Sequence, residues 1–155
     1  MKPLIVLLSA FIISILFFKI TKKTLAFELS AKIAMAIMLV FTAIGHFAFT
    51  KGMAMMIPPM IPFKTTLIYL TGIFEILMAI CLLIPKLGHL TGWVLILFFV
   101  LMLPANIYAS FHEINYQKGT FDGHGLLYLW FRIPLQVLFI VWVYLSSVKS
   151  IPNSL

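Results

Sequence analysis

Residues 65–85 read TTLIYLTGIFEILMAICLLIP, and this stretch decides the fold. Nearly all of its residues are apolar, and its one acid, Glu75, stands at the midpoint. A helix of this length crosses a hydrocarbon layer of about 30 Å. An ionised carboxylate at the centre of a bilayer costs about 2.5–3.5 kcal/mol on insertion scales, so Glu75 has to face protein or water, or be protonated. The stretch predicts a transmembrane helix whose acid meets another part of the chain.

The composition of the whole chain agrees with a membrane protein. Of its 155 residues, 63% are hydrophobic and 10% are charged, whereas a soluble domain carries about 25% charged residues. The net charge of +7 would suit a nucleic-acid-binding protein, but the lysines stand at the ends of apolar segments. That placement is typical of topology anchors. We therefore expect the protein to interact with the lipid bilayer and not with nucleic acid.

Five apolar segments are long enough to cross a membrane, and we expect them at residues 3–18, 33–50, 65–85, 89–109 and 126–146. The first ends in Phe17-Phe18-Lys19 and lacks the small residues of a cleavage site, which favours a retained helix over a signal peptide. With the N-terminus outside, lysines on the inner side outnumber those on the outer side by six to four. This small excess favours an N-out, C-in orientation.

The segments between the spans differ in character. Residues 21–32 are expected to form a short polar connection. Residues 51–64, KGMAMMIPPMIPFK, contain three prolines, which forbid a continuous helix. Because the segment is apolar, we expect it to fold against the bundle or to lie in the headgroup layer. Residues 110–125 form the one long polar loop.

Polar residues inside the spans converge on one side of the membrane. Successive spans alternate in direction, so depth follows from position along the chain. His46, Asn106 and Arg132 fall in the same membrane half, and Glu75 falls at the midplane. We expect Arg132 and Glu75 to pair, because removing one partner of a buried pair costs about 3–5 kcal/mol.

Prolines inside two spans add backbone groups that need hydrogen-bond partners. Pro104 and Pro134 release backbone carbonyls that need donors, and the amides of Asn106 and Gln136 can supply them. Two interpretations stay open and are compatible: a structural network that holds the bundle together, or a binding pocket open to one membrane face. The candidate residues for either are His46, Glu75, Asn106, Arg132 and Gln136.

Other motifs carry little chemistry. The polar loop holds metal-ligand residue types at His112, Glu113, Asp122 and His124, but their spacing matches no strong template, so no metal site is expected. The single Cys81 excludes an intramolecular disulfide and a CxxC redox pair. The sequence contains no H-E-x-x-H, no G-x-S-x-G and no glycine-rich phosphate loop. Whether the protein is an enzyme stays open.

An ordered set of short segments carries a family resemblance over residues 33–146. The segments are Gly45-His46-Phe47, Ile57-Pro58-Pro59-Met60-Ile61-Pro62, Thr71-Gly72-Ile73-Phe74-Glu75, Leu83-Ile84-Pro85, Pro104-Ala105-Asn106-Ile107-Tyr108 and Arg132-Ile133-Pro134-Leu135-Gln136. Together they resemble the DoxX family of small bacterial membrane proteins. The resemblance implies an all-α membrane protein with an antiparallel four-helix transmembrane bundle. Residues 1–30 would then be an extra N-terminal transmembrane helix with its connection, and residues 31–148 the DoxX-like membrane domain.

The resemblance also implies a functional class. Founding members of that family are associated with a quinone-reducing thiosulfate oxidoreductase, in which the DoxX-type chain is a membrane subunit. This implies a multi-pass protein of the bacterial inner membrane, a quinone as the candidate cofactor, and a membrane or redox partner subunit. Related MauE-type proteins are linked to disulfide formation, and the single Cys81 argues against that activity here.

Two functional hypotheses follow. In the first, a redox-associated subunit binds a quinone or another lipid-soluble molecule in a polar intramembrane pocket, with hydrogen bonds from the candidate residues and a proton on Glu75. In the second, the protein is a non-enzymatic assembly factor or structural subunit, because it has no recognised catalytic motif. A transporter ranks last, since five spans without an internal repeat are few for alternating access.

Overall fold

The computed structural model describes residues 2–22 and 26–149, and these are almost entirely helical. The long helices are α1 (Lys2–Lys22), α2 (Phe27–Ala48), α4 (Lys64–Leu83), α5 (Gly88–Phe111) and α6 (Leu126–Val143). Helix α3 (Thr50–Met55) is short, and the π-helical segment η1 (Tyr144–Val148) extends α6. Five helices, counting α6 with η1 as one, are long and apolar enough to cross a membrane. The predicted all-α membrane fold is confirmed.

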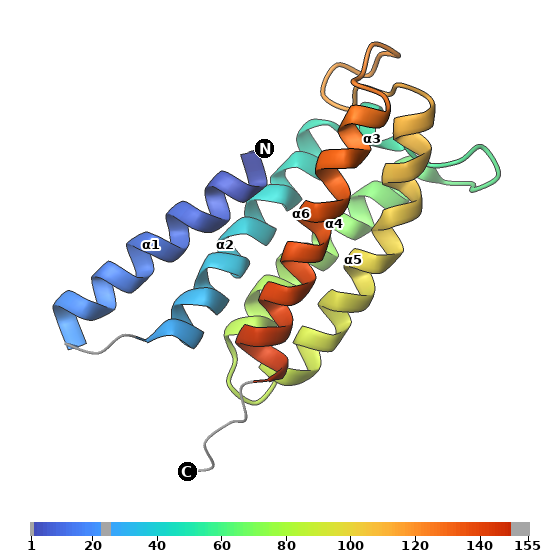
Figure 1. Cartoon of the computed structure of the whole chain (residues 1–155). Coiled ribbons are helices and arrows are strands. Elements are labelled where there is room, and N and C mark those ends of the chain that lie inside the picture. Colours follow the sequence, from blue (N-terminus) through green and yellow to red (C-terminus); the bar gives the residue numbers. More distant parts are fainter. Residues whose placement is uncertain (1, 23–25, 150–155) are drawn as a thin grey trace.

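The helices run alternately up and down, with α1 at one edge (Figure 1). Helix α1 packs on α2, α2 packs mainly on α4, and α5 packs mainly on α6 and η1. Helix α4 also contacts α5, which closes an antiparallel bundle of α2, α4, α5 and α6. Helix α3 and the 112–125 loop lie at one end of this bundle, and the turn between α4 and α5 lies at the other (Figure 1).

Apolar side chains from all four bundle helices fill the core. Met35 and Leu39 of α2, Leu82 of α4, Leu95 of α5 and Val143 of α6 are fully buried. Because lipid is as apolar as these side chains, helices in a membrane associate mainly through close packing. The rest of each helix exposes apolar residues, as a lipid-facing surface requires.

Helix α1 touches the bundle along a narrow stripe. Leu7 is fully buried, and the ring of Phe11 packs edge-on against Trp142, with centroids 4.9 Å apart. The indole of Trp142 in turn donates a hydrogen bond of 3.1 Å to the carbonyl of Ala31 on α2. Helix α1 therefore joins α2 and the end of α6 while keeping most of its surface free.

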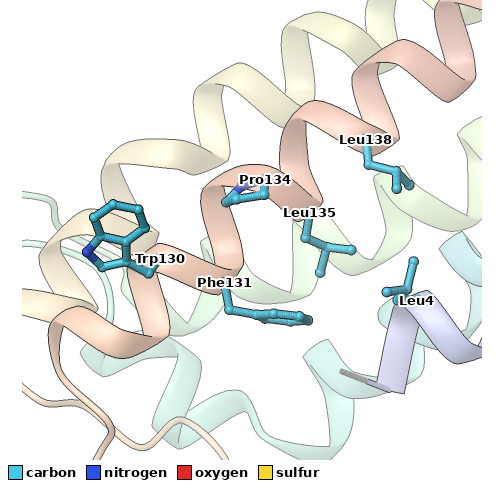
Figure 2. A pocket seen from close by; sticks show the side chains of 6 residues that line it. All are labelled: Leu4, Trp130, Phe131, Pro134, Leu135 and Leu138. Carbon is cyan, nitrogen blue, oxygen red and sulfur yellow. The ribbon is translucent and has the colours of Figure 1, made fainter.

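Two apolar grooves flank α1. One lies between α1 and α6 and has a volume of about 220 Å³ (Figure 2). Figure 2 shows Leu4 of α1 facing Phe131 and Leu135 of α6 across it. The other runs along the α1–α2 seam and has a volume of about 450 Å³. None of the five candidate polar residues lines either groove.

The first connection differs from the sequence expectation. Helix α2 already begins at Phe27, so Glu28 belongs to its first turn, and the predicted polar connection over residues 21–32 is too long. Residues 27–36, FELSAKIAMA, contain good helix formers, which explains the early start. The middle of that connection, residues 23–25, lies outside the described residues.

The proline-rich segment has a folded part and a projecting part. Helix α3 takes up Thr50–Met55 and ends before the first proline. Ile57 is buried, whereas Met60 is 91% exposed. The connection between α3 and α4 projects from the bundle (Figure 1). Lys64 holds the base of this loop, since its ammonium donates a hydrogen bond of 2.7 Å to the carbonyl of Ile57. No continuous helix crosses the segment, as predicted from its prolines.

Candidate functional site

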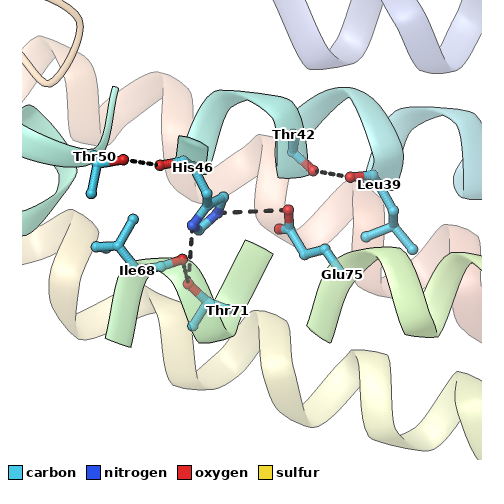
Figure 3. Close-up of polar contacts among 7 residues, drawn as sticks. All are labelled: Leu39, Thr42, His46, Thr50, Ile68, Thr71 and Glu75. Carbon is cyan, nitrogen blue, oxygen red and sulfur yellow. Dashed lines mark hydrogen bonds and ion pairs between the residues drawn. The ribbon is translucent and has the colours of Figure 1, made fainter. Parts of the chain in front are cut away.

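The buried acid of α4 has a histidine beside it. Glu75 is 6% exposed, and its Oε2 lies 3.6 Å from Nε2 of His46 on α2 (Figure 3). This distance suits an ion pair but is too long for a hydrogen bond, and Oε2 makes no hydrogen bond. A charged or polar atom buried in this way is costly unless it finds a partner.

The predicted pair between Glu75 and Arg132 is wrong. The ion pairs among residues 2–22 and 26–149 are His46–Glu75 and Lys118–Asp122. The reason lies in the lateral order of the helices, because α4 packs on α2 and α5, whereas α6 packs mainly on α5. Arg132 on α6 therefore does not reach Glu75.

Thr71 fixes the orientation of the imidazole. Its Oγ1 lies 3.0 Å from Nδ1 of His46 and donates its proton to the carbonyl of Ile68 at 2.9 Å (Figure 3). A hydroxyl has one proton, so with that proton on the Ile68 carbonyl we expect the Thr71 oxygen to accept a hydrogen bond from Nδ1–H of His46. A bare Nε2 lone pair facing an ionised carboxylate would be repulsive. One proton therefore lies on the Glu75 side of the pair, either on Nε2 or on the carboxyl group.

Close packing of α2 against α4 makes this contact possible. A Cβ added to Gly72 would stand 3.0 Å from Cβ of His46, so the helices could not approach as closely with a larger residue there. Next to the pair, Phe47 and Tyr69 stack with ring centroids 5.9 Å apart. Both rings are 43% exposed. The α2–α4 seam beside His46 thus reaches the outer surface of the bundle.

A second polar group joins α5 to α6. The hydroxyl of Tyr128 donates a hydrogen bond of 3.1 Å to Oδ1 of Asn106. The Asn106 amide lies 3.5 Å from Oε1 of Gln136 and donates to the carbonyl of Met102 at 2.9 Å. The Gln136 amide donates to the carbonyl of Phe99. These bonds tie the facing sides of α5 and α6 together.

The side-chain amides of Asn106 and Gln136 donate to backbone carbonyls other than the expected ones. A proline at position 104 frees the carbonyl four residues earlier, at Val100, but the acceptors for Asn106 and Gln136 are Met102 and Phe99. The expectation that these amides bond to the carbonyls freed by Pro104 and Pro134 is therefore wrong, and both amides donate to other backbone carbonyls of α5. Helix α5 runs through Pro104 without a break.

Arg132 stands inside the second group without a bond to it. Tyr128, Arg132 and Gln136 are four residues apart on α6 and share one face. Arg132 is half-buried, and its Nε is buried with no hydrogen-bond partner. The five predicted residues thus separate into an α2–α4 pair and an α5–α6 group, and no hydrogen bond or ion pair links the two within the described chain.

Two polar residues of the site were missed from the sequence. Thr71 precedes Glu75 by four residues and Tyr128 precedes Arg132 by four. That spacing puts each on the same helical face as its charged neighbour. The spacing alone could have placed both residues on the helix faces that carry Glu75 and Arg132.

The ionisable side chains of the polar loop contact different partners. Asp122 accepts hydrogen bonds from the Thr120 hydroxyl and from the Lys118 ammonium at 3.5 Å. The bond from Thr120 lowers the pKa of Asp122, desolvation opposes it, and the Lys118 charge adds to the lowering. His112 stacks on Tyr108, with centroids 4.0 Å apart. Among residues 2–22 and 26–149, no group of three or more His, Cys, Asp or Glu could hold a metal ion.

In the comparison with known proteins, a family model matches the part of the chain that forms the helical bundle. The model of one family, described as a domain of unknown function (DUF8561), matches residues 35–147. This range begins within α2 and ends within η1, so it leaves out α1. No curated protein and no solved structure matches the chain. Because the matched range covers well over half of its residues, the chain belongs to the DUF8561 family of domains of unknown function.

Proposed function

We propose that this protein is a DoxX-like, redox-associated membrane subunit that binds a quinone or another lipid-soluble molecule at the His46–Glu75 pair. One observation carries the proposal: a buried carboxylate oxygen, Glu75 Oε2, makes no hydrogen bond and lies 3.6 Å from an imidazole. A buried polar atom without a hydrogen bond costs about 1–3 kcal/mol. A head group that hydrogen-bonds to it would offset that cost.

The chemistry of a quinone suits such a pair. Its carbonyl oxygens accept hydrogen bonds, and reduction to a quinol adds protons to them. The His46–Glu75 pair would supply one of the two protons that a quinol needs, and the second would come from water at the same membrane face. The α2–α4 seam beside Phe47 and Tyr69 would be the route from the bilayer. The electrons would come from a redox partner subunit. The proposal extends to a bacterial inner membrane and an N-out, C-in orientation.

Thermal unfolding with a short-chain quinone analogue tests the proposal. We expect the melting temperature of the wild-type protein in lipid nanodiscs to rise with quinone concentration, because a ligand at one hundred times its Kd stabilises by about 2.7 kcal/mol. The variants Glu75→Gln and His46→Gln should stay folded and lose this rise.

Glu28→Gln is the matched control, since Glu28 is an exposed acid in the first turn of α2. It should keep the full quinone-dependent rise. A wild-type protein whose melting temperature ignores the quinone, or two pair variants that respond like the wild type, would refute the proposed site.

The α5–α6 group favours a second candidate, a non-enzymatic assembly factor or structural subunit. Tyr128, Asn106 and Gln136 direct their hydrogen bonds to one another and to α5 carbonyls, as a network that only holds helices together would. A stable partner protein retained after gentle solubilisation, together with no response to quinone, would support this candidate over the first.

A further inference from the structure

We propose that Arg132 binds a phosphate-like anion beside the α5–α6 interface. This site is separate from the His46–Glu75 pair and does not depend on the function proposed above. The observation behind it is a charge imbalance inside a membrane-spanning helix. Arg132 lies in α6, its Nε is buried without a hydrogen bond, and it forms no ion pair with any described residue.

None of the acidic side chains of the chain pairs with Arg132. The chain has four Asp and Glu residues, and all four are described. Glu75 pairs with His46, and Asp122 pairs with Lys118. Neither Glu28, at the opposite end of the bundle, nor Glu113, in the polar loop, forms an ion pair. An arginine keeps its charge at any pH a protein experiences, and no described acid pairs with Arg132, so we infer that another molecule supplies the counter-charge.

The neighbours of Arg132 shape the site but use their own hydrogen bonds. Tyr128 and Gln136, one turn before and one turn after it, are both bonded to Asn106 across the interface. Gln136 also donates to the carbonyl of Phe99. The guanidinium donors are therefore the ones left for a ligand. Their planar fork matches two oxygens of a phosphate or carboxylate, which a lysine could not do.

The depth of Arg132 makes an anion from the membrane surface reachable. Arg132 is the seventh residue of α6, so its Cα lies about 9 Å below the start of the helix. A long arginine side chain extends toward the interface when its charge has no partner in the bilayer. The phosphate of a lipid headgroup and a free phosphate ion share this chemistry, and the two sources can be separated by experiment.

Arg132 is the only arginine in the chain, so labelling arginine with ¹⁵N reports on this residue alone. The unaltered protein is compared in two preparations. One is a bilayer of phosphatidylglycerol without inorganic phosphate, and the other is a phosphate-free detergent with added inorganic phosphate. Solid-state NMR measures dipolar dephasing of the guanidinium ¹⁵N signals by ³¹P. Dephasing in the bilayer alone identifies a lipid phosphate, and dephasing with inorganic phosphate identifies a site that takes free anions. No dephasing in either preparation overturns the proposal.

Binding measurements on variants give an independent check. Native mass spectrometry with phosphatidylglycerol, or with inorganic phosphate if that is the source, should show at least a tenfold weaker affinity for Arg132→Gln than for the wild type. Arg132→Lys keeps the charge and loses the fork, so it should fall between them. Lys51→Gln removes the same charge from an exposed position of α3 at the same end of the bundle and should bind as the wild type does. Equal losses in Lys51→Gln and Arg132→Gln would mean that the anion follows net charge and that no site exists at Arg132.

Discussion

At the scale of single residues, one hydroxyl proton decides which nitrogen of His46 carries hydrogen. With the Thr71 proton on the carbonyl of Ile68, we expect Nδ1–H of His46 to donate to Thr71. We predict that Thr71→Val leaves His46 with hydrogen on Nε2 alone, because Nδ1–H loses its acceptor while Nε2–H faces the Glu75 carboxylate. Nitrogen NMR of ¹⁵N-histidine protein in nanodiscs measures the tautomer.

Thr71→Ser is the matched control, because it keeps the hydroxyl and should keep the Nδ1–H tautomer. The other three histidines, His89, His112 and His124, are exposed and serve as internal references. If the His46 signals of Thr71→Val equal those of the wild type, Thr71 does not set the tautomer.

Energetic coupling should follow the observed pair. We predict that Glu75→Gln and His46→Gln show a coupling free energy of unfolding of about 0.5–3 kcal/mol, as residues in contact do. The combination of Glu75→Gln with Arg132→Gln should be additive within about 0.5 kcal/mol, because those side chains form no ion pair. Denaturant unfolding of the four variants of each cycle in detergent gives both values. Coupling in the second cycle as strong as in the first would contradict the arrangement described here.

The sequence predicted that polar residues from different helices meet, but it did not predict which of them pair. Depth follows from counting along spans that alternate in direction, and His46 does meet Glu75, the midplane acid. The choice between His46 and Arg132 as its partner depends on which helices are neighbours. Hydrophobic periodicity says which residues face a neighbour but does not say which helix that neighbour is.

At the scale of helices, α3 depends on a glycine at a tight contact. A Cβ added to Gly52 would lie 1.9 Å from the carbonyl oxygen of Tyr116, in the loop that follows α5. We predict that Gly52→Ala lowers the free energy of unfolding by about 1–3 kcal/mol, because backbone atoms on both sides must move apart. Thermal unfolding in detergent measures the loss.

Gly45→Ala is the comparison for Gly52→Ala. A Cβ at Gly45 would meet only the terminal methyl of Met53 at 3.6 Å, an ordinary contact. Alanine in the interior of a helix is more favourable than glycine by about 0.5–1 kcal/mol, so Gly45→Ala should be neutral or stabilising. Similar losses of unfolding free energy in both variants would mean that the contact with Tyr116 does not explain the effect of Gly52→Ala.

The five spans were predictable because about twenty apolar residues in a row admit few structures. The prolines showed where a helix could not continue over residues 51–64, and the break is there. The contact of α3 with the 112–125 loop was beyond the sequence, because Gly52 and Tyr116 are far apart along the chain and neither carries a pairing signal.

At the scale of the whole molecule, the orientation in the membrane stays a prediction. Lys118 and Lys86 are both exposed and lie at opposite ends of the bundle (Figure 1). In a Cys81→Ser background, an N-out orientation predicts that Lys118→Cys reacts with a membrane-impermeant maleimide on intact bacterial cells. Lys86→Cys should react only after the cells are permeabilised. The reverse pattern would establish the opposite orientation.

The order of the helices along the chain has a consequence for biogenesis. During co-translational insertion, α2 leaves the ribosome before α4, so the imidazole of His46 already stands in the bilayer when the Glu75 carboxylate arrives. The translocon therefore never has to release that acid into lipid alone. Helix α6 follows all the other membrane-spanning helices described, and Arg132 enters a membrane in which every acid of the chain has been synthesised and none pairs with it. Where a lipid supplies the anion that we propose for Arg132, the insertion of α6 is the assembly step that depends on the anionic lipids of the membrane.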